Sequence, residues 1–235
     1  KLFAHGWWTV EGEKISKTTG NVINVNELVS IAGLDSLRYF LFREVPFGED
    51  GDFSKEKLIE RHNNELADKL GNLVSRVSAL AEKYGLEKHK ILPLDKKWKK
   101  IISSGEGKIE NINKESGFYT LNKITEEGSE GLLPIYPRTF IKIIEKDIEK
   151  HFDTFELDKV LSEIFAIIDF CNRFVQQWKI WETKNPRHLY ELVEAIRKIN
   201  FYLAPFMPET SEKIAKIFKG DKIKKAEPLF VKIGK

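Results

Sequence analysis

Cysteine and long apolar segments are both scarce in this sequence. Its 235 residues include a single cysteine, Cys171, which excludes a framework of internal disulfides and a zinc site built from cysteines. No stretch approaches the roughly 18 consecutive apolar residues of a membrane-spanning helix, and residues 1–7 lack the apolar region of a secretory signal. These absences predict a cytoplasmic protein without a membrane segment, in a compartment that keeps its thiol reduced.

An excess of charge of either sign is also missing. Thirty-nine lysines and arginines against 36 aspartates and glutamates leave a net charge of +3, which neither demands nor excludes a nucleic acid as partner. Any basic surface must therefore be local, and the lysine runs at 96–100 and 222–225 are expected to be solvated faces. Because the chain opens with lysine, we expect a fragment or a processed piece. The scattered histidines lack metal-ligand spacing, so no metal site is expected.

The first 53 residues predict a small segment of mixed α and β structure. Residues 7–10 are strand-like and residues 11–13 form a turn. Two short helices follow, one capped by Asn26 and one over residues 36–43 capped by Asp35. The segment therefore has the character of the edge of a larger domain.

Residues 54–235 predict an antiparallel helical bundle. Ser54 is placed to cap its first helix, in which the apolar residues keep to one stripe as far as Gly85. Residues 91–137 are rich in Gly, Ser, Asn, Lys and Glu and are interpreted as an insertion, with local structure and disorder both open. Helical periodicity returns over residues 138–151, 156–181, 186–203 and 209–218.

The first cluster with chemical meaning is Lys14-Ile15-Ser16-Lys17-Thr18-Thr19-Gly20-Asn21. Lys14 and Lys17 supply mobile positive charges for phosphate oxygens, and Ser16 and Thr18 add hydroxyl donors. Gly20 allows the backbone to turn sharply. The cluster therefore suits a polyphosphate. A solvated loop of lysines is the alternative that this short pattern leaves open by itself.

The surrounding run, residues 5–18, resembles the KMSKS region of the class I aminoacyl-tRNA synthetases. Ile15 stands where that signature has methionine, and Thr18 stands where it ends in serine. In that family the loop closes over ATP and stabilises the pyrophosphate leaving group as the adenylate forms, a use of preorganised positive charge. The resemblance implies that Lys14 and Lys17 are catalytic and that Lys14, Ser16, Lys17 and Thr18 bind ATP.

Three further stretches, residues 50–54, 61–67 and 70–76, resemble the anticodon-binding domain of the methionyl-tRNA synthetases. With residues 37–40 they extend the resemblance collinearly from residue 1 to about 84. The synthetases for leucine, valine, isoleucine and cysteine are less similar in this part. The methionine enzymes are therefore the family that the sequence indicates.

This resemblance implies a mainly α fold. Residues 54–235 are expected to form the antiparallel helical bundle of class Ia anticodon-binding domains, with an insertion at about 91–137. Residues 1–53 are expected to hold the KMSKS loop and the short α/β stem-contact segment, at the edge of the catalytic domain. The resemblance is good over residues 1–90 and 138–205 and weak beyond 205.

Asn72 and Arg76 are four residues apart, so they share one face of a helix. At 100° per residue they fall roughly 80–120° from the apolar stripe, at the edge of solvent. Arginine offers a planar fork of donors and asparagine offers a donor and an acceptor, which suits the edges of unstacked bases in an RNA loop. The alternative is an ordinary polar helix flank. In the family, residues at these two positions contact the anticodon.

Residues 172–181 resemble the family stretch that ends in a tryptophan stacked on the anticodon, and Trp181 matches that tryptophan. Ile180 stands where the family commonly has proline. Trp178 lies at the centre of the apolar stripe, which predicts core packing, whereas Trp181 falls about 60° to the side. A tryptophan at the edge of a helix end can stack on a base that is turned out of an RNA loop.

The resemblance implies part of a methionine–tRNA ligase that recognises the CAU anticodon of tRNA(Met). ATP with Mg²⁺ and methionine would be bound only with the catalytic half, present in cis or as a partner subunit. The chain alone is therefore expected to be inactive. Two alternatives stay open: a separately encoded tRNA-binding subunit of a split synthetase, favoured by an apolar patch at Phe3, Trp7 and Trp8, and a non-catalytic helical scaffold.

Overall fold

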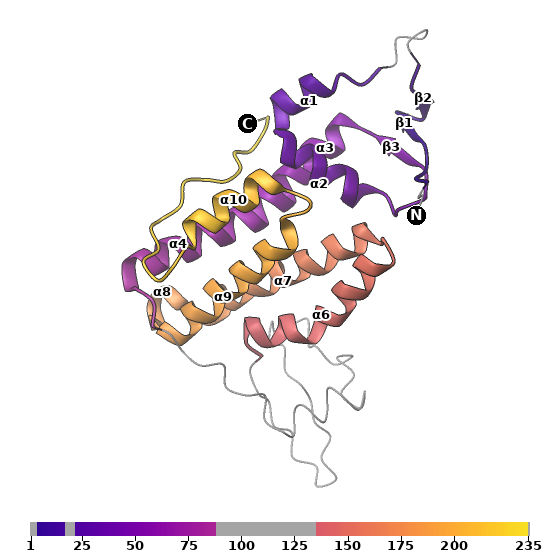
Figure 1. The fold of residues 1–235 in the computed structure, drawn as a ribbon. Helices are drawn as coiled ribbons and strands as arrows, with labels where there is room; N and C mark the ends of the chain where they lie inside the picture. The colour runs from indigo at the N-terminus through magenta and orange to yellow at the C-terminus, as the bar shows by residue number, and fades with distance from the viewer. Residues whose placement is uncertain (1–3, 17–21, 88–134, 235) are drawn as a thin grey trace, which may run out of the picture.

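The structure is a computed structural model that describes residues 4–16, 22–87 and 135–234. Figure 1 shows a small region of strands and short helices near the N-terminus, beside a larger group of long helices. The chain is mainly helical, as the sequence predicts. The predicted insertion lies outside the described residues except at its end, where Pro137 begins a helix.

The elements follow in this order along the chain. They are β1 (Trp8–Val10), β2 (Glu13–Lys14), α1 (Val25–Ala32), α2 (Leu34–Glu44), β3 (Gly51–Phe53), α3 (Lys55–Arg61), η1 (His62–Gly71), α4 (Asn72–Tyr84), α6 (Pro137–Asp153), α7 (Leu157–Gln177), α8 (Ile180–Thr183), α9 (Pro186–Leu203) and α10 (Pro208–Ile217).

The strands form one sheet in the order β2-β1-β3, with β1 antiparallel to β2 and parallel to β3. The β1–β2 turn has two residues of positive φ, Glu11 at 52° and Gly12 at 78°, which suits a tight hairpin. Asp52 on β3 fastens this hairpin, because its Oδ1 accepts hydrogen bonds from Gly12 N at 2.8 Å and Thr9 Oγ1 at 2.7 Å. These bonds lower the pKa of Asp52 and hold it as a carboxylate.

A small apolar cluster lies beneath the sheet and the short helices. It joins side chains of α1, α2, β3 and α3: Leu28, Ala32, Leu37, Phe40, Phe53 and Leu58. Trp8 and Val10 of β1 pack against its edge. The hairpin that leads into the lysine loop is thereby attached to the start of the long helical stretch at α3.

Two predicted helix caps in this region are wrong. Asn24 caps α1 in place of Asn26, because its Oδ1 accepts from the backbone N–H of Glu27 at 3.3 Å. Asp35 lies inside the first turn of α2 and is buried. Its Oδ2 accepts from the backbone N–H of Thr210 at 2.6 Å, so it serves the start of α10 rather than its own helix. Such a long-range partner leaves no local pattern in the sequence.

The helical stretch from Lys55 to Tyr84 is continuous, but its centre is a π-helix, η1. Ser54 caps it and it ends at Gly85, both as predicted. A π-helix bonds each N–H to the carbonyl five residues back and therefore winds more slowly than an α-helix. The sequence predicts an α-helix here. It does not reveal the π-helix, because the apolar stripe of Leu66, Leu70 and Leu73 fits both forms.

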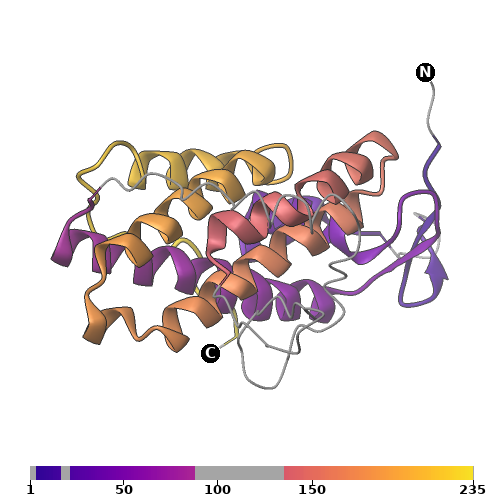
Figure 2. The ribbon, with the colours of Figure 1, turned by 90° about the horizontal axis from the view of Figure 1, so that it is seen from below.

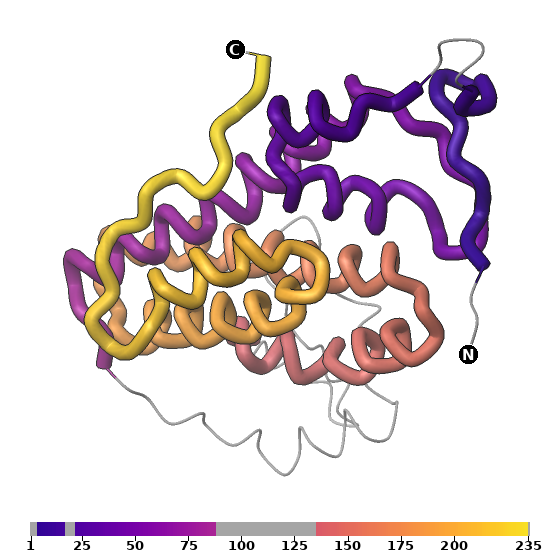
Figure 3. The backbone as a smooth tube through the Cα atoms, turned by 45° about the horizontal axis from the view of Figure 1, so that its top comes forward, coloured from indigo at the N-terminus to yellow at the C-terminus, as the bar shows by residue number. Residues whose placement is uncertain are grey.

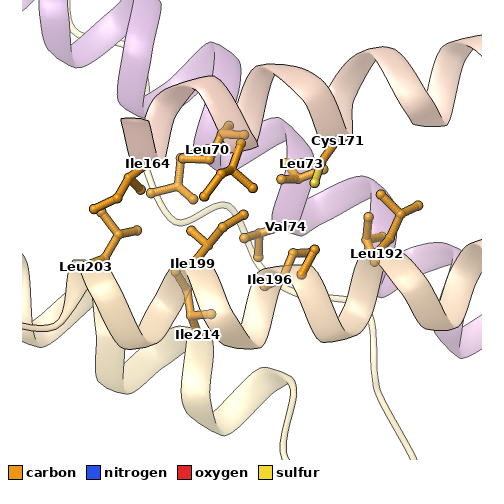
Figure 4. Close-up of a cluster of buried hydrophobic side chains, with 14 of the residues drawn as sticks. Leu70, Leu73, Val74, Ile164, Cys171, Leu192, Ile196, Ile199, Leu203 and Ile214 are labelled. Carbon is orange, nitrogen blue, oxygen red and sulfur yellow. The ribbon is translucent and has the colours of Figure 1, made fainter. Parts of the chain in front are cut away.

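The bundle consists of α4, α6, α7, α9 and α10, which lie side by side in Figures 1 and 2. Its core is formed by aliphatic and aromatic side chains that are almost completely buried, and each such burial contributes about 1.5–3 kcal/mol. Cys171 lies among them, and its burial raises the pKa of the thiol, so it remains protonated. Figure 4 shows part of this core: Leu70, Leu73, Val74, Ile164, Cys171, Leu192, Ile196, Ile199, Leu203 and Ile214.

The longest predicted helix, residues 156–181, is interrupted. Helix α7 ends at Gln177, and Lys179 adopts a left-handed conformation with φ of 40°. The chain then forms the short helix α8, which Lys184 ends in another left-handed conformation. The apolar periodicity continues across this break because Ile180 is fully buried, and periodicity alone therefore did not reveal it.

The segment after α10, residues 219–234, has no regular structure and runs back along α4 and η1 toward α1 (Figure 3). We call it the C-terminal strap. It is held along its length: Ala226 N donates to Ser78 Oγ at 3.0 Å, and Lys232 pairs with Asp68 at 2.6 Å. The strap thus connects the end of the bundle to the N-terminal cluster.

His62, a buried residue of η1, makes a further attachment of the strap. Its Nε2 lies 2.9 Å from the carbonyl oxygen of Val231, and its Nδ1 lies 2.9 Å from Ser36 Oγ. Because a carbonyl can only accept, Nε2 donates to Val231, while Nδ1 is paired with the serine hydroxyl. One imidazole therefore joins α2, η1 and the strap.

We expect His62→Leu to lower the free energy of unfolding by about 1–3 kcal/mol, because Ser36 and the Val231 carbonyl lose their partner while apolar bulk is kept. Urea denaturation followed by circular dichroism measures the change. Asn64→Ala, at an exposed position of the same element, is the control. Unchanged stability of His62→Leu would contradict the role given to the imidazole.

Candidate nucleic-acid interface

Asn72 and Arg76 lie in the first turns of α4, and both side chains are exposed. Asn72 Nδ2 donates to the carbonyl oxygen of Asp68 at 2.7 Å, which fixes the amide and leaves Oδ1 and one N–H for a partner. The two residues share a helix face, so an amide and a guanidinium face solvent side by side. This pair can hydrogen-bond to base edges, which agrees with their predicted accessibility.

Trp181 lies on α8 and is 41% exposed, whereas Trp178 is half-buried and packs against the bundle core. The prediction that Trp178 packs in the core and Trp181 is exposed agrees with this burial. The predicted cause of the exposure was helical phase on one long helix, whereas in the structure the chain changes direction at the left-handed Lys179. The buried Ile180 beside it anchors α8 to the bundle.

Tyr84 connects the two parts of this surface. Its hydroxyl donates to the carbonyl oxygen of Trp181 at 3.1 Å, which joins the last turn of α4 to α8. Since α4 rises 1.5 Å per residue, Tyr84 lies about 12 Å along the helix from Arg76. An exposed surface therefore runs from Asn72 along α4 to an exposed indole. We call this surface, formed by Asn72, Arg76 and Trp181, the α4–α8 surface.

An aromatic cluster supports the α8 end of this surface. His188 on α9 is buried, with its ring centroid 4.6 Å from that of Trp178, 5.4 Å from Phe174 and 5.8 Å from Tyr136. Burial lowers the pKa of His188, and the charge of Arg187 lowers it further. The imidazole is therefore neutral at neutral pH. The sequence identified His188 only as a scattered histidine, because its surroundings come from three separate helices.

The described part of the predicted ATP site lies at the other end of the molecule. Lys14 is exposed in β2 and Ser16 is half-buried just after it, while Lys17 and Thr18 lie outside the described residues. Figure 1 shows the β1–β2 hairpin and α8 at opposite ends of the molecule. The structure therefore does not bring Lys14 and Ser16 together with Asn72, Arg76 and Trp181.

An open polar cleft of about 280 Å³ lies between α2 and the helical stretch of α3 and η1. Arg61 bridges Glu44 at 2.6 Å and Glu65 at 3.2 Å, and the Tyr39 hydroxyl donates to Glu65 at 2.5 Å. These internal pairings engage Glu44, Arg61 and Glu65, three of the charged residues that line the cleft. Over residues 4–16, 22–87 and 135–234, no group of His, Cys, Asp or Glu is arranged to hold a metal ion, and no helix is long and apolar enough to span a membrane.

Known protein families match both parts of the chain. Residues 1–78 match the model of class I tRNA synthetases (M), and residues 138–232 match that of the anticodon-binding domain of tRNA ligases. The second match extends beyond residue 205, into the part of the sequence whose motifs resemble the family only weakly. The two matches, with the lysine loop in the first and α8 in the second, define a class I aminoacyl-tRNA synthetase.

Individual relatives give the amino acid specificity of the family. Methionine–tRNA ligases of Caldanaerobacter subterraneus and Rickettsia conorii are 34% and 33% identical over 91% of this chain, and that of Helicobacter pylori is 32% identical over 93%. The chain belongs to the methionyl-tRNA synthetase family. It spans 29% of the length of the first and third of these relatives and 37% of the second.

Solved structures agree at the level of the fold. Mycobacterium tuberculosis methionyl-tRNA synthetase in complex with methionyl-adenylate superposes with a TM-score of 0.67 at 24% identity, covering 91% of this chain and 37% of that one. Its apo form gives a TM-score of 0.70 at 19% identity, covering 100% of this chain and 44% of that one. The arrangement of hairpin and bundle is therefore shared with intact synthetases.

The buried neutral His188 predicts a loss of stability in mild acid. Its folded-state pKa lies below its unfolded value, so the unfolded chain binds the proton first, and stability falls as the pH drops below about 6.5. We expect the melting temperature to fall between about pH 7.5 and 5, and to fall less steeply in His188→Gln. Equal slopes for the two proteins in a thermal melt at each pH would contradict this assignment.

Proposed function

We propose that this chain is the part of a methionine–tRNA ligase that recognises the CAU anticodon of tRNA(Met). The observation that carries the proposal is the α4–α8 surface: an exposed amide and an exposed guanidinium on α4, and an exposed indole on α8 beyond the end of α4. Sequence-specific RNA recognition targets unstacked bases through hydrogen bonds to their edges and stacking on aromatic rings. The relatives' activity and the matched anticodon-binding domain support the same assignment.

Each residue of the surface has a distinct proposed role. Arg76 supplies a fork of donors to a base edge, and Asn72 supplies an acceptor oxygen in a fixed orientation. Trp181 provides a flat ring on which an unstacked base lies. The bundle core holds these groups at fixed separations, so the anticodon is selected by its shape as well as by its hydrogen bonds.

The hairpin end has a second proposed role, in ATP-dependent activation of methionine. Lys14 and Lys17, with Ser16 and Thr18, would stabilise the phosphates of ATP with its Mg²⁺ as pyrophosphate leaves. This chemistry requires the catalytic half, in cis or as a partner subunit, so the 235 residues alone are expected not to activate methionine. Trp7, just before β1, is 77% exposed and offers an apolar surface to such a partner. The cytoplasm is the proposed compartment.

Trp181→Ala is expected to weaken binding of tRNA(Met) by about 5- to 150-fold, the loss of one base–aromatic stack. Filter binding with the purified chain measures the effect. Trp178→Phe keeps the core packing and is expected to bind like wild type. The opposite ranking of the two variants would show that the stacking residue has been misassigned.

Arg76→Ala is expected to cost about 1–3 kcal/mol of binding to tRNA(Met) and to reduce the preference over a tRNA with an altered anticodon. Arg76→Lys is expected to restore little of this preference, because an ammonium lacks the planar fork. If Arg76→Lys discriminates like wild type, the residue contacts phosphate rather than a base. If the wild type itself has no preference, the anticodon proposal fails and a scaffold role is favoured.

A further inference from the structure

The π-helix η1 ends at Gly71, directly before Asn72, a residue proposed to contact the anticodon. In a π-helix the N–H of residue i bonds to the carbonyl of residue i−5, and in an α-helix to that of residue i−4. The backbone N–H of Asn72 still points to the carbonyl of Ala67, five residues back, and is shared with that of Lys69. The hydrogen-bond register of the helix therefore changes at Asn72.

Two side-chain amides also donate to backbone carbonyls at this junction. The carbonyl of Asp68 accepts from Asn72 Nδ2 at 2.7 Å, and the carbonyl of Lys69 accepts from Asn172 Nδ2 at 3.1 Å. In an uninterrupted α-helix the carbonyl of Asp68 would bond to the backbone N–H of Asn72. In the π register the backbone N–H of Asn72 goes elsewhere, so it does not compete with its own side-chain amide for the Asp68 carbonyl.

Helix α7 holds Lys69 at two points. Asn172 bonds to its carbonyl, and Asp169 pairs with its Nζ at 2.9 Å. Asp169 and Asn172 are three residues apart, so they project from the same face of α7. Leu73, next to Asn72 on α4, and Cys171, next to Asn172 on α7, lie close together in Figure 4. The ion pair is partly exposed and weak, whereas Asn172 is half-buried with a fixed amide.

We infer that Asn172 is a positioning residue for anticodon recognition. By holding the Lys69 carbonyl it keeps the last turn of η1 in the π register, and this keeps the Asn72 amide on the Asp68 carbonyl with Oδ1 directed outward. Loss of Asn172 lets the backbone N–H of Asn72 take the Asp68 carbonyl, which releases the Asn72 side chain into many rotamers. The inference rests on the proposed role of Asn72 and deepens it.

A double-mutant cycle tests the inference. The affinities of wild type, Asn172→Ala, Asn72→Ala and the double variant are measured for a tRNA(Met) transcript with the CAU anticodon and for one with an altered anticodon. Asn172→Ala is expected to reduce the preference for CAU by about tenfold, and to cause no further reduction in the Asn72→Ala background. A purely structural role would weaken both tRNAs equally and would add to the effect of Asn72→Ala.

Two further variants complete the test. Asn172→Asp keeps the size of the side chain but cannot donate to a carbonyl when ionised, so it is expected to behave like Asn172→Ala even if the alanine variant folds poorly. Asn64→Ala removes an exposed amide from η1 and is expected to leave the preference unchanged. Wild-type preference in Asn172→Ala or Asn172→Asp would overturn this inference alone, whereas no preference in the wild type would overturn the proposed function with it.

Discussion

The helical stretch of α3, η1 and α4 buries its two ends in different apolar clusters. Leu58 packs with Phe40 and Phe53 near the sheet, whereas Leu73 and Val77 pack in the bundle. A π-helical centre winds more slowly than an α-helix and so changes the direction in which the apolar face points. Because one helical stretch packs in both apolar clusters, its π-helical centre determines how the hairpin end and the α4–α8 surface are oriented relative to each other.

Contacts that are distant in sequence make this joint rigid. Asp35 accepts from the first turn of α10, and the C-terminal strap runs from the bundle to η1, where His62 and Lys232 hold it. Tyr84 fastens α4 to α8 at the far end. The α4–α8 surface and the β1–β2 hairpin are thus parts of one framework, which is what the proposed coupling of anticodon recognition to activation requires.

The sequence predicted the helices and the exposure of Asn72, Arg76 and Trp181, because apolar periodicity and helical phase are local properties. It did not predict η1, since a stripe of leucines fits both registers, nor the break at Lys179, since Ile180 continues the apolar pattern. The partners of Asp35, His62 and Asn172 were also missed, because each lies more than twenty residues away in the chain. The residue types were enough to propose which groups could contact RNA. The geometry of these groups depends on contacts between distant parts of the chain, which the sequence does not show.

The central claim is that the α4–α8 surface contacts the anticodon. Its most direct measurement is an NMR titration of the chain with the isolated anticodon stem–loop, following the indole N–H signals of its five tryptophans. The account predicts that the Trp181 signal shifts strongly with the CAU hairpin and weakly with an altered anticodon, while Trp178 stays nearly unchanged. Binding of the CAU hairpin without a shift of Trp181, or equal shifts with both hairpins, would contradict it.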